Sequence, residues 1–396
     1  MYIFNPEHDL ALANFSSNYT PPSSAIRMAK DLAVLPVWYS EQKVVIAEGE
    51  VNREFLETIK SKLQLPAQII SYLEIAQRPK EEIIPWGWNP SLCKKLLSYG
   101  VPESQLPTIR DLQMLRDYSS RKNAVQLLKE LKSENSDFCG KSCFFQEIDE
   151  LLSYLHSIPG NKVLKMPVSG SGKGLIWILG EITDKQTDWC KRVIKVQGGV
   201  VAEPVLDKVL DFAMEFYMDN SVIDFRGYSL FRSASSGAYV GNELISDEKV
   251  ERVLAQYVHF KSILQLRKLL MEKLSDLFPE YKGYLGVDMM ICNTDEGFKI
   301  QPCVEINMRM NMGVVSRLFH NKYMNPEGEG SFVVSYFKKS ENTVKFHEKL
   351  QQESPLKVEN GKIVSGYLSL TPVTADTNYI VYVIVKKIIC FSAQAF

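Results

Sequence analysis

Two carboxylates, one amide and one guanidinium stand at spacings that suit metal and phosphate binding. Asp288 comes first, and Glu305, Asn307 and Arg309 follow at every second position. Carboxylate and amide oxygens are hard ligands that suit Mg²⁺, which usually keeps waters or takes phosphate oxygens as its other ligands. Two unpaired acids on a half-buried surface would repel each other and be desolvated, so a counter-cation is expected beside them. These residues therefore predict a divalent-metal site.

The segment that carries these residues, 286–309, has the pattern of a β-hairpin. Strands are predicted at 286–291 and 298–309, and the turn at 293–297 holds the polar residues and glycine that reverse a chain. Side chains alternate between the faces of a strand, so the last three polar residues share one face, and the aspartate falls near Glu305 if the pairing includes a bulge or a one-residue slip. The alternative is a solvated face with an Arg–Glu cross-strand pair. The regular apolar alternation on the other face favours the metal site.

The totals describe an ordinary globular protein. The chain has 396 residues, 45% hydrophobic and 23% charged, which is enough for two or three packed units. The formal net charge of −1 gives no electrostatic case for nucleic acid or membrane as a partner. No apolar run approaches about 18 residues, the first residues lack the features of a secretory signal, and the seven cysteines show no framework pattern. A cytoplasmic protein with reduced thiols is therefore expected.

A glycine-rich segment, PVSGSGKG at 167–174, lies between two apolar stretches with β-strand pattern. It is not a P-loop, because Pro167 stands where the first glycine should be and Gly174 where Ser or Thr should be, and its glycine spacing is not that of a dinucleotide fingerprint. The flanking patterns predict a hairpin loop. Glycines let backbone N–H groups close over an anion, so we interpret the loop as a flap over phosphates, with an ordinary surface hairpin tip as the alternative. The residues concerned are Ser169, Gly170, Ser171, Gly172, Lys173 and Gly174.

The N-terminal residues suggest a ligand site of a different kind. A strand is predicted at 1–4, followed by a helix with Asn5 as its N-cap and Pro6 at its first position. A strand that runs into a helix N-terminus is how α/β domains place ligands at strand ends. His8 and Asn14 are therefore candidate substrate contacts, with a local cap and an exposed histidine as the alternative.

The order of patterns along the chain predicts its division into units. Residues 1–110 have the pattern of a small open α/β domain, with a further strand expected at 31–37. Strand and helix alternate through the central part, and a turn-rich boundary follows at 321–330. Residues 326–396 hold a charged helix and strands.

Taken in order, these features resemble those of the ATP-grasp enzymes over roughly residues 110–320. The ordered set is a helix lysine, a strand lysine, the glycine-rich hairpin, two acids on strands, and the motifs VDMM and VEINMR. The pair GVD and EIN-x-R is its most specific element. The resemblance implies an α/β protein with an ATP-grasp domain at 111–325, built from two α+β subdomains that divide near residue 199. It also implies that residues 1–110 are a pre-ATP-grasp domain, which usually helps to bind substrate.

The resemblance further implies a role for each polar residue. Lys165 and Lys122 would bind phosphates, with Arg121 as an alternative to Lys122, and the glycine loop would act as a lid. The adenine hinge would be residues 203–206, with Glu203, Val205 and Leu206, and Glu215 would lie near the ribose. Asp288, Glu305 and Asn307 would hold one or two Mg²⁺ ions, for which Mn²⁺ could substitute.

The remaining implied roles concern catalysis and substrate. Arg309 and Arg232 would stabilise the transferred phosphoryl group or the acyl intermediate. Asn311 and Gly313, in the loop after the first of these arginines, join the N-terminal residues as candidate substrate contacts.

The chemistry that suits these residues is phosphoryl transfer from ATP to a carboxylate, which is catalysed mainly by positioning and by countering charge. The hypothesis is a Mg²⁺-dependent ligase that joins a carboxylate to an amine through an acyl phosphate. Its substrates would be small molecules or peptides, and a homodimer is compatible with the sequence. One alternative is a kinase whose phosphorylated product persists. The other is an ATP-binding regulatory module without turnover.

Overall fold

The computed structural model describes residues 1–41, 44–170, 174–234 and 237–387. Its N-terminal unit is a parallel sheet with strand order β3-β2-β1-β4. The strands are β1 (Tyr2–Ile3), β2 (Val44–Ile46), β3 (Gln68–Ile70) and β4 (Ile84–Pro85). The helices of this unit are α1 (His8–Asn14), α2 (Ser23–Asp31), η1 (Leu35–Trp38), α3 (Glu50–Lys60), η2 (Tyr72–Gln77), α4 (Pro90–Ser98) and η3 (Glu103–Gln105). The predicted small α/β unit is therefore present.

Two local predictions in this unit are wrong. The stretch 31–37 is not a strand, because α2 ends at Asp31 and the 3₁₀ helix η1 follows. This stretch is a short apolar run that is buried almost throughout, and such a run does not by itself distinguish strand from helix. Asn5 does not cap α1, whose N-cap is Glu7. The Asn5 amide instead donates to the carbonyl of Gly87 at 2.8 Å, and so joins the ends of two parallel strands.

The second unit is a small antiparallel sheet with strand order β5-β8-β6-β7. Its strands are β5 (Cys143–Phe145), β6 (Lys162–Lys165), β7 (Leu175–Ile178) and β8 (Val200–Pro204), and its helices are α7 (Ile148–Ser157) and α8 (Asp184–Gln197). Helices α5 (Ile109–Tyr118) and α6 (Arg121–Glu134) precede it. The predicted glycine hairpin is confirmed, because β6 and β7 pair and the N–H of Met166 donates to the carbonyl of Gly174.

The largest element is a nine-stranded sheet with order β13-β12-β9-β10-β11-β14-β17-β16-β15, and all its neighbouring strands are antiparallel. Its strands are β9 (Asp207–Asp219), β10 (Val222–Ser233), β11 (Tyr239–Leu244), β12 (Lys282–Thr294), β13 (Gly297–Asn307), β14 (Gly330–Tyr336), β15 (Lys357–Glu359), β16 (Lys362–Ser369) and β17 (Tyr379–Val385). Its helices are α9 (Asp247–Leu254), α10 (Phe260–Leu277), α11 (Met312–Tyr323) and α12 (Ser340–Glu353). Because β14 pairs with β11, the C-terminal strands extend the sheet of the central unit.

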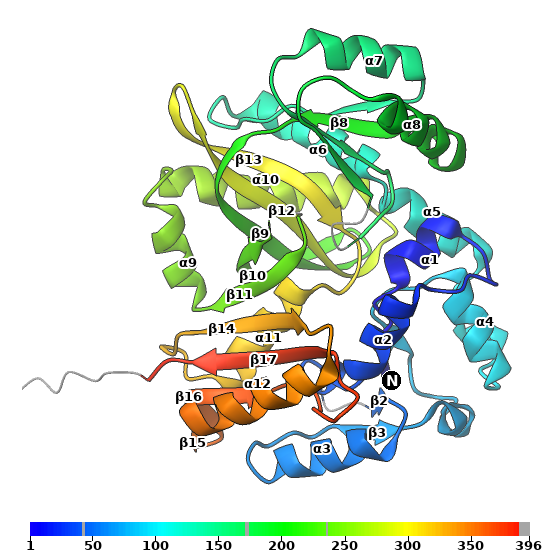
Figure 1. Cartoon of the computed structure of the whole chain (residues 1–396), viewed down its shortest axis with the longest axis vertical. Coiled ribbons are helices and arrows are strands. Elements are labelled where there is room, and N and C mark those ends of the chain that lie inside the picture. Colours follow the sequence, from blue (N-terminus) through cyan, green and yellow to red (C-terminus); the bar gives the residue numbers. More distant parts are fainter. Residues whose placement is uncertain (42–43, 171–173, 235–236, 388–396) are drawn as a thin grey trace, which may run out of the picture.

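Figure 1 shows how the three sheets are arranged. The small sheet lies at the top with α7 and α8, the C-terminal strands lie at the lower left, and the N-terminal sheet lies at the lower right. One face of the β9–β13 region packs against α6, α9 and α10 through apolar side chains such as Phe212, Met214 and Val287. The polar face opposite to this core is therefore available for a site.

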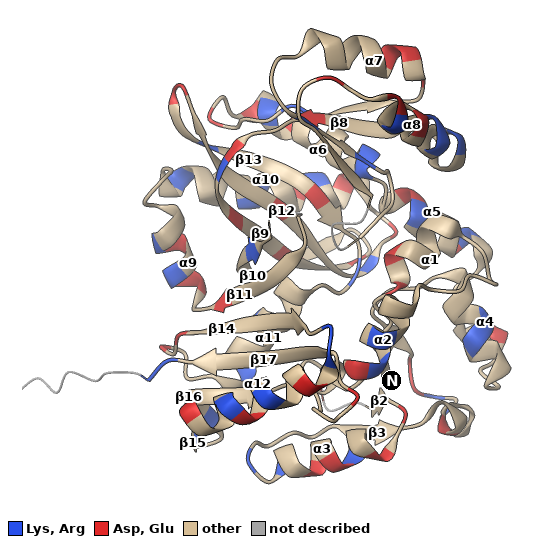
Figure 2. Cartoon of the chain, viewed as in Figure 1, with Lys and Arg blue, Asp and Glu red and all other residues tan. Residues whose placement is uncertain are grey.

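Charge is mixed over the surface of the molecule. Figure 2 shows Lys and Arg interspersed with Asp and Glu along helices such as α8, α9 and α12. None of the helices among the described residues combines the length and apolar character needed to cross a membrane.

The N-terminal unit and the C-terminal strands share one core. Trp38 of η1 is fully buried, donates its indole N–H to the carbonyl of Leu370 at 2.6 Å, and packs edge-on against Phe319 of α11. A second connection comes from Asp31, whose carboxylate accepts the backbone N–H groups of residues 378 and 379 at the start of β17. These contacts attach η1 and α2 to α11 and to the nine-stranded sheet.

The first testable consequence concerns this shared core. We expect Trp38→Phe to lower the free energy of unfolding by about 2 kcal/mol, because the carbonyl of Leu370 loses its donor and the smaller ring leaves a cavity. Urea denaturation measures the change. Trp177→Phe, at a side chain that is 41% exposed, is the control and should change stability by less than about 0.5 kcal/mol. An equal effect of the two substitutions would contradict this account of the core.

Candidate active site

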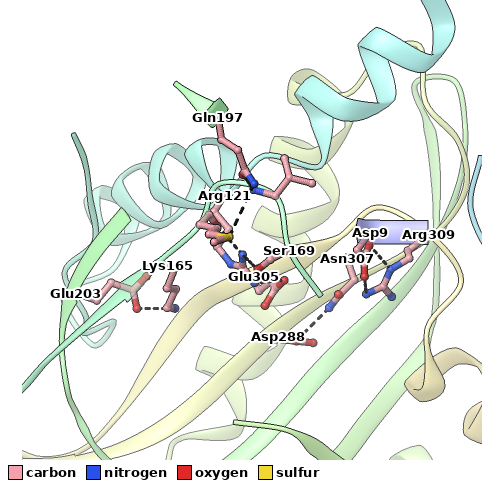
Figure 3. Close-up of polar contacts among 12 residues, drawn as sticks. Asp9, Arg121, Lys165, Ser169, Gln197, Glu203, Asp288, Glu305, Asn307 and Arg309 are labelled. Carbon is pink, nitrogen blue, oxygen red and sulfur yellow. Dashed lines mark hydrogen bonds and ion pairs between the residues drawn. The ribbon is translucent and has the colours of Figure 1, made fainter. Parts of the chain in front are cut away.

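The hairpin of β12 and β13 places the predicted metal ligands together. Asp288 and Glu305 are direct cross-strand partners, and a bulge follows between Asp288 and Met290, so the predicted pairing is confirmed. The Asn307 amide donates to Oδ2 of Asp288 at 3.1 Å. All three side chains come from neighbouring strands on the polar face of the sheet, as Figure 3 shows.

The electrostatics of this pair favour a bound cation. Burial, and after it the charge of Glu305, together raise the pKa of Asp288 to about 7. A cation beside the two carboxylates would reverse both effects. No group of three or more His, Cys, Asp or Glu side chains suited to a metal occurs within the part of the chain that the structure describes. The two carboxylates and the amide oxygen would therefore bind a hard ion together with phosphate or water oxygens.

Arg121, the first residue of α6, connects this hairpin to the glycine loop. Its Nη2 donates to Oε1 of Glu305 at 2.7 Å, and its Nη1 donates at 2.7 Å to both the carbonyl of Met166 and the hydroxyl of Ser169. The side chain is only 5% exposed. The arginine therefore contacts a predicted metal ligand and the entry of the predicted phosphate loop at once.

The structure thus places Arg121, the alternative to Lys122, at the site. Lys122 is exposed and lies 6.0 Å from the ring centroid of Phe144. Successive helix residues point about 100° apart, so one residue of the pair faces inward. The apolar residues Ala124, Leu128 and Leu131, at three, seven and ten positions after Arg121, carried the signal that residue 121 lies on the buried face.

The remaining predicted nucleotide contacts lie on the small sheet. Lys165 on β6 forms an ion pair with Glu203 on β8 at 2.7 Å, and Ser142 also donates to Glu203 at 2.9 Å. Val205 and Leu206 follow β8 directly and join the small sheet to the nine-stranded sheet, with the N–H of Val205 donating to the carbonyl of residue 161 at 2.9 Å. In the view of Figure 3 the Lys165 pair lies at one end of the row of site residues.

Arg309 lies at the other end of that row and is held by a residue that the sequence analysis missed. Its Nε and Nη2 donate to the two carboxylate oxygens of Asp9 at 2.8 and 2.7 Å. Asp9 lies on α1, three hundred positions earlier in the chain. Its position one residue after His8, in a predicted ligand-binding turn, was the only signal that the sequence offered.

The two predicted N-terminal substrate contacts differ in burial: one is buried and the other is exposed. His8 is 2% exposed and packs against Gly87, and its Nδ1 has no hydrogen-bond partner among the described residues. The alternative of an exposed histidine is therefore wrong. Burial lowers the pKa of His8 to about 4, so that its imidazole is neutral near pH 7. Asn14 ends α1 on the surface and is exposed.

Glu215 occupies the same face of the sheet as the metal ligands and meets the loop after Arg309. Strand pairing places it beside Gly286 of β12, and the Asn311 amide donates to its Oε2 at 2.9 Å. A Cβ on Gly313 would lie 2.0 Å from its Oε1, so a glycine is required there. Asn311 also caps α11 by accepting from the N–H of Val314. Both predicted substrate residues of this loop therefore pack against the buried acid.

Several predicted residues are not placed with this group. The register pairs Phe231 with Asp211, and Arg232, the next residue along β10, lies on the opposite face. Arg232 contacts Glu243 at 3.5 Å, and 56% of its side chain is exposed. Ser171, Gly172 and Lys173 lie outside the described residues. Gly174 ends the loop with φ of +80°, a conformation that favours glycine.

Comparison with solved structures gives matches along most of the chain. Biotin carboxylase from Campylobacter jejuni, solved as a beta-gamma-ATP complex, gives a TM-score of 0.52 at 12% identity over 87% of this chain and 87% of that chain. N5-carboxyaminoimidazole synthetase from Staphylococcus aureus, complexed with ADP, gives a TM-score of 0.48 at 11% identity, and the match covers 87% of this chain and 92% of that chain. L-amino acid ligase from Bacillus licheniformis gives 0.44 at 12% identity over 86% and 93%. No family model and no curated protein sequence matches the chain. At 12% identity the likeness to the biotin carboxylase shows the fold and not the reaction.

The buried carboxyl group of Glu215 predicts that the free energy of unfolding depends on pH. Burial raises its pKa to about 8 from the ordinary value of 4.5, while the hydrogen bond from Asn311 acts in the opposite direction. Between these two pH values the folded protein keeps a proton that the unfolded chain releases, so stability falls as the pH rises. We expect the wild type to lose about 2 kcal/mol more than Glu215→Gln between about pH 6 and pH 8. Urea denaturation at each pH measures this difference, and parallel curves for the two proteins would contradict it.

Proposed function

We propose that this chain, which has the ATP-grasp fold, is an ATP- and Mg²⁺-dependent ligase that joins a carboxylate to an amine or a similar nucleophile through an acyl phosphate. The observation that carries the proposal is the cross-strand pair of Asp288 and Glu305, with Asn307 beside it, on a partly buried sheet face. Basic side chains from α6, from β6 and from the end of the hairpin itself lie around this pair, and phosphoryl transfer depends on such a concentration of positive charge. ATP, Mg²⁺ and small carboxylate and amine substrates follow from this assignment.

The nucleotide would lie between the small sheet and the polar face of the nine-stranded sheet. Support comes from two buried cations. Lys165 on the small sheet is paired with Glu203, and Arg121, next to the nine-stranded sheet, is paired with Glu305. The Lys165 ammonium carries three N–H groups, of which Glu203 accepts one, and Nε of Arg121 has no partner within the part of the chain that the structure describes. Phosphate oxygens would provide acceptors for these donors. Residues 203–206, where the chain passes between the sheets, are assigned to the adenine.

The metal and phosphate chemistry can be assigned to residues in the same way. Asp288, Glu305 and Asn307 would hold Mg²⁺, which when bound supplies positive charge against the phosphate oxygens. Arg309 would bind the oxygens of the transferred phosphoryl group or of the acyl phosphate. Ser169 and the backbone N–H groups of the glycine loop would cover the phosphates and exclude water.

The reaction itself needs no nucleophile from the protein. The substrate carboxylate attacks the γ-phosphorus of ATP and ADP leaves, and the amine then attacks the acyl carbon, loses a proton and expels phosphate. The side chains position these groups and counter the charge that develops on the phosphate oxygens. Asp288 and Glu305 would act only through the ion that they hold.

Turnover of ATP by the purified protein tests this proposal. We expect ADP and phosphate to form in the presence of Mg²⁺ and a mixture of candidate carboxylates and amines, together with a new amide. A phosphorylated product that persists would identify a kinase instead. Nucleotide binding without ADP release in any mixture would identify a binding module.

The metal assignment has its own test in the same assay. We expect Glu305→Ala combined with Asn307→Ala to reduce turnover by at least about 100-fold, because two of the three oxygen ligands are removed. Glu296→Ala, which removes an exposed carboxylate from the turn of the same hairpin, is the matched control and should leave turnover unchanged. Wild-type rates in the double variant would remove these residues from the metal site.

A further inference from the structure

The contact between Asp9 and Arg309 joins two units at the edge of the site. The two side chains form a bidentate pair, with distances of 2.8 and 2.7 Å, and are 17% and 12% exposed. Bidentate pairing of a guanidinium with a carboxylate fixes the direction of the guanidinium plane as well as its position. A flexible arginine at the end of β13 is thereby held in one orientation.

The donors of Arg309 can be counted. A guanidinium has five N–H groups. Nε and Nη2 each donate one to Asp9, and Nη1 donates one to the carbonyl of Met310 at 3.2 Å. These bonds leave one N–H on each of the two terminal nitrogens. The arginine can therefore contact an oxyanion with both terminal nitrogens while Asp9 continues to hold it.

The charges around this pair favour the same arrangement. Although burial alone would raise the pKa of Asp9, the charge of Arg309 and the hydrogen bonds to it lower that pKa, so the carboxylate stays ionised. Arg309 in turn faces the charges of Glu305 and Asp288. Without Asp9 its guanidinium would be attracted towards those acids, which are the proposed metal ligands.

Gly170 adds the glycine loop to this contact. A Cβ placed on Gly170 would lie 1.9 Å from Oδ2 of Asp9, so the backbone of the loop entry rests directly against the carboxylate. The adjacent Ser169 is held by Arg121, which itself contacts Glu305. Asp9 therefore lies between the arginine and the loop that would cover the phosphates.

We propose that Asp9 is a positioning residue of the active site, which directs two N–H groups of Arg309 towards the transferred phosphoryl group and keeps that arginine away from the metal ligands. The proposal rests on the function proposed above and adds a residue of the N-terminal unit to it. Binding of ATP does not require Asp9, whereas the stabilisation of the transferring phosphoryl group does. The competing explanation is that the pair only ties α1 to the central sheet.

Binding of ADP with a mimic of the transferring phosphoryl group separates the two explanations. Isothermal titration calorimetry measures the affinity for MgADP with and without fluoroaluminate. We expect fluoroaluminate to increase the affinity of the wild type, and Asp9→Asn to bind MgADP within about 2-fold of it while losing about 10-fold or more of the fluoroaluminate gain. Arg309→Gln should lose the same gain, and combining the two substitutions should cost little more, because they remove one interaction.

Two further variants serve as controls. Asp31→Asn weakens a different connection between the N-terminal unit and a distant strand, and should lower the thermal unfolding temperature while keeping the full fluoroaluminate gain. Asp9→Glu keeps the carboxylate and should recover part of the gain. If Asp9→Asn does not fold, the fluoroaluminate gain of Asp9→Glu tests the proposal in its place.

Three other results of the binding experiment would each contradict a different part of the proposal. Asp9→Asn with the full fluoroaluminate gain and a lower unfolding temperature would show that the pair is only a structural tie. A wild type that binds MgADP without any fluoroaluminate gain would exclude the role of Arg309 on which the inference depends. A wild type that fails to bind MgADP would instead sink the proposed function itself.

Discussion

Two carboxylates that face each other across neighbouring strands are the constraint on which the rest of the site depends. Side by side on a partly buried surface, Asp288 and Glu305 repel each other and lose part of their hydration, which is unfavourable unless positive charge is supplied. The protein supplies some of it through Arg121, which binds one oxygen of Glu305. Asp288 accepts only the neutral amide of Asn307 among the hydrogen bonds described. The proposed cation would provide the counter-charge that the Asp288 carboxylate lacks among the contacts described.

The positive charges that meet this pair come from separate parts of the chain. Arg121 begins α6, Lys165 lies on the small sheet, and Arg309 ends the hairpin itself. Each of these cations is paired with an acid at 2.7 Å, so none is buried without a counter-charge. A phosphate group that entered the site would share or replace these partners. The contacts of Arg121 and Arg309 also join separate units, and all three cations would be available to such an anion.

The N-terminal unit, which carries α1, packs against the central sheet through a shared core. Trp38 and Asp31 attach the N-terminal unit to α11 and β17, and the core they enter includes residues from both ends of the chain. Next to the site, the N–H of Met310 donates to the carbonyl of Trp86 at 3.2 Å, and the side chain of Met310 belongs to the same core. Asp9 and Arg309 are not members of this core, and their bidentate contact lies beside it.

The sequence by itself determined the features that depend on local pattern. Alternation of apolar and polar residues predicted the β12–β13 hairpin, and glycines between two strand patterns predicted the loop between β6 and β7. Both depend on strand periodicity and turn chemistry, which act over a few residues. Tertiary structure decided that Arg121 meets Glu305, that the apolar run at 31–37 is not a strand, and that Arg232 meets Glu243. It also decided that the C-terminal strands continue the central sheet and that Asp9 meets Arg309. These outcomes depend on contacts between residues up to three hundred positions apart, and no local periodicity records such contacts.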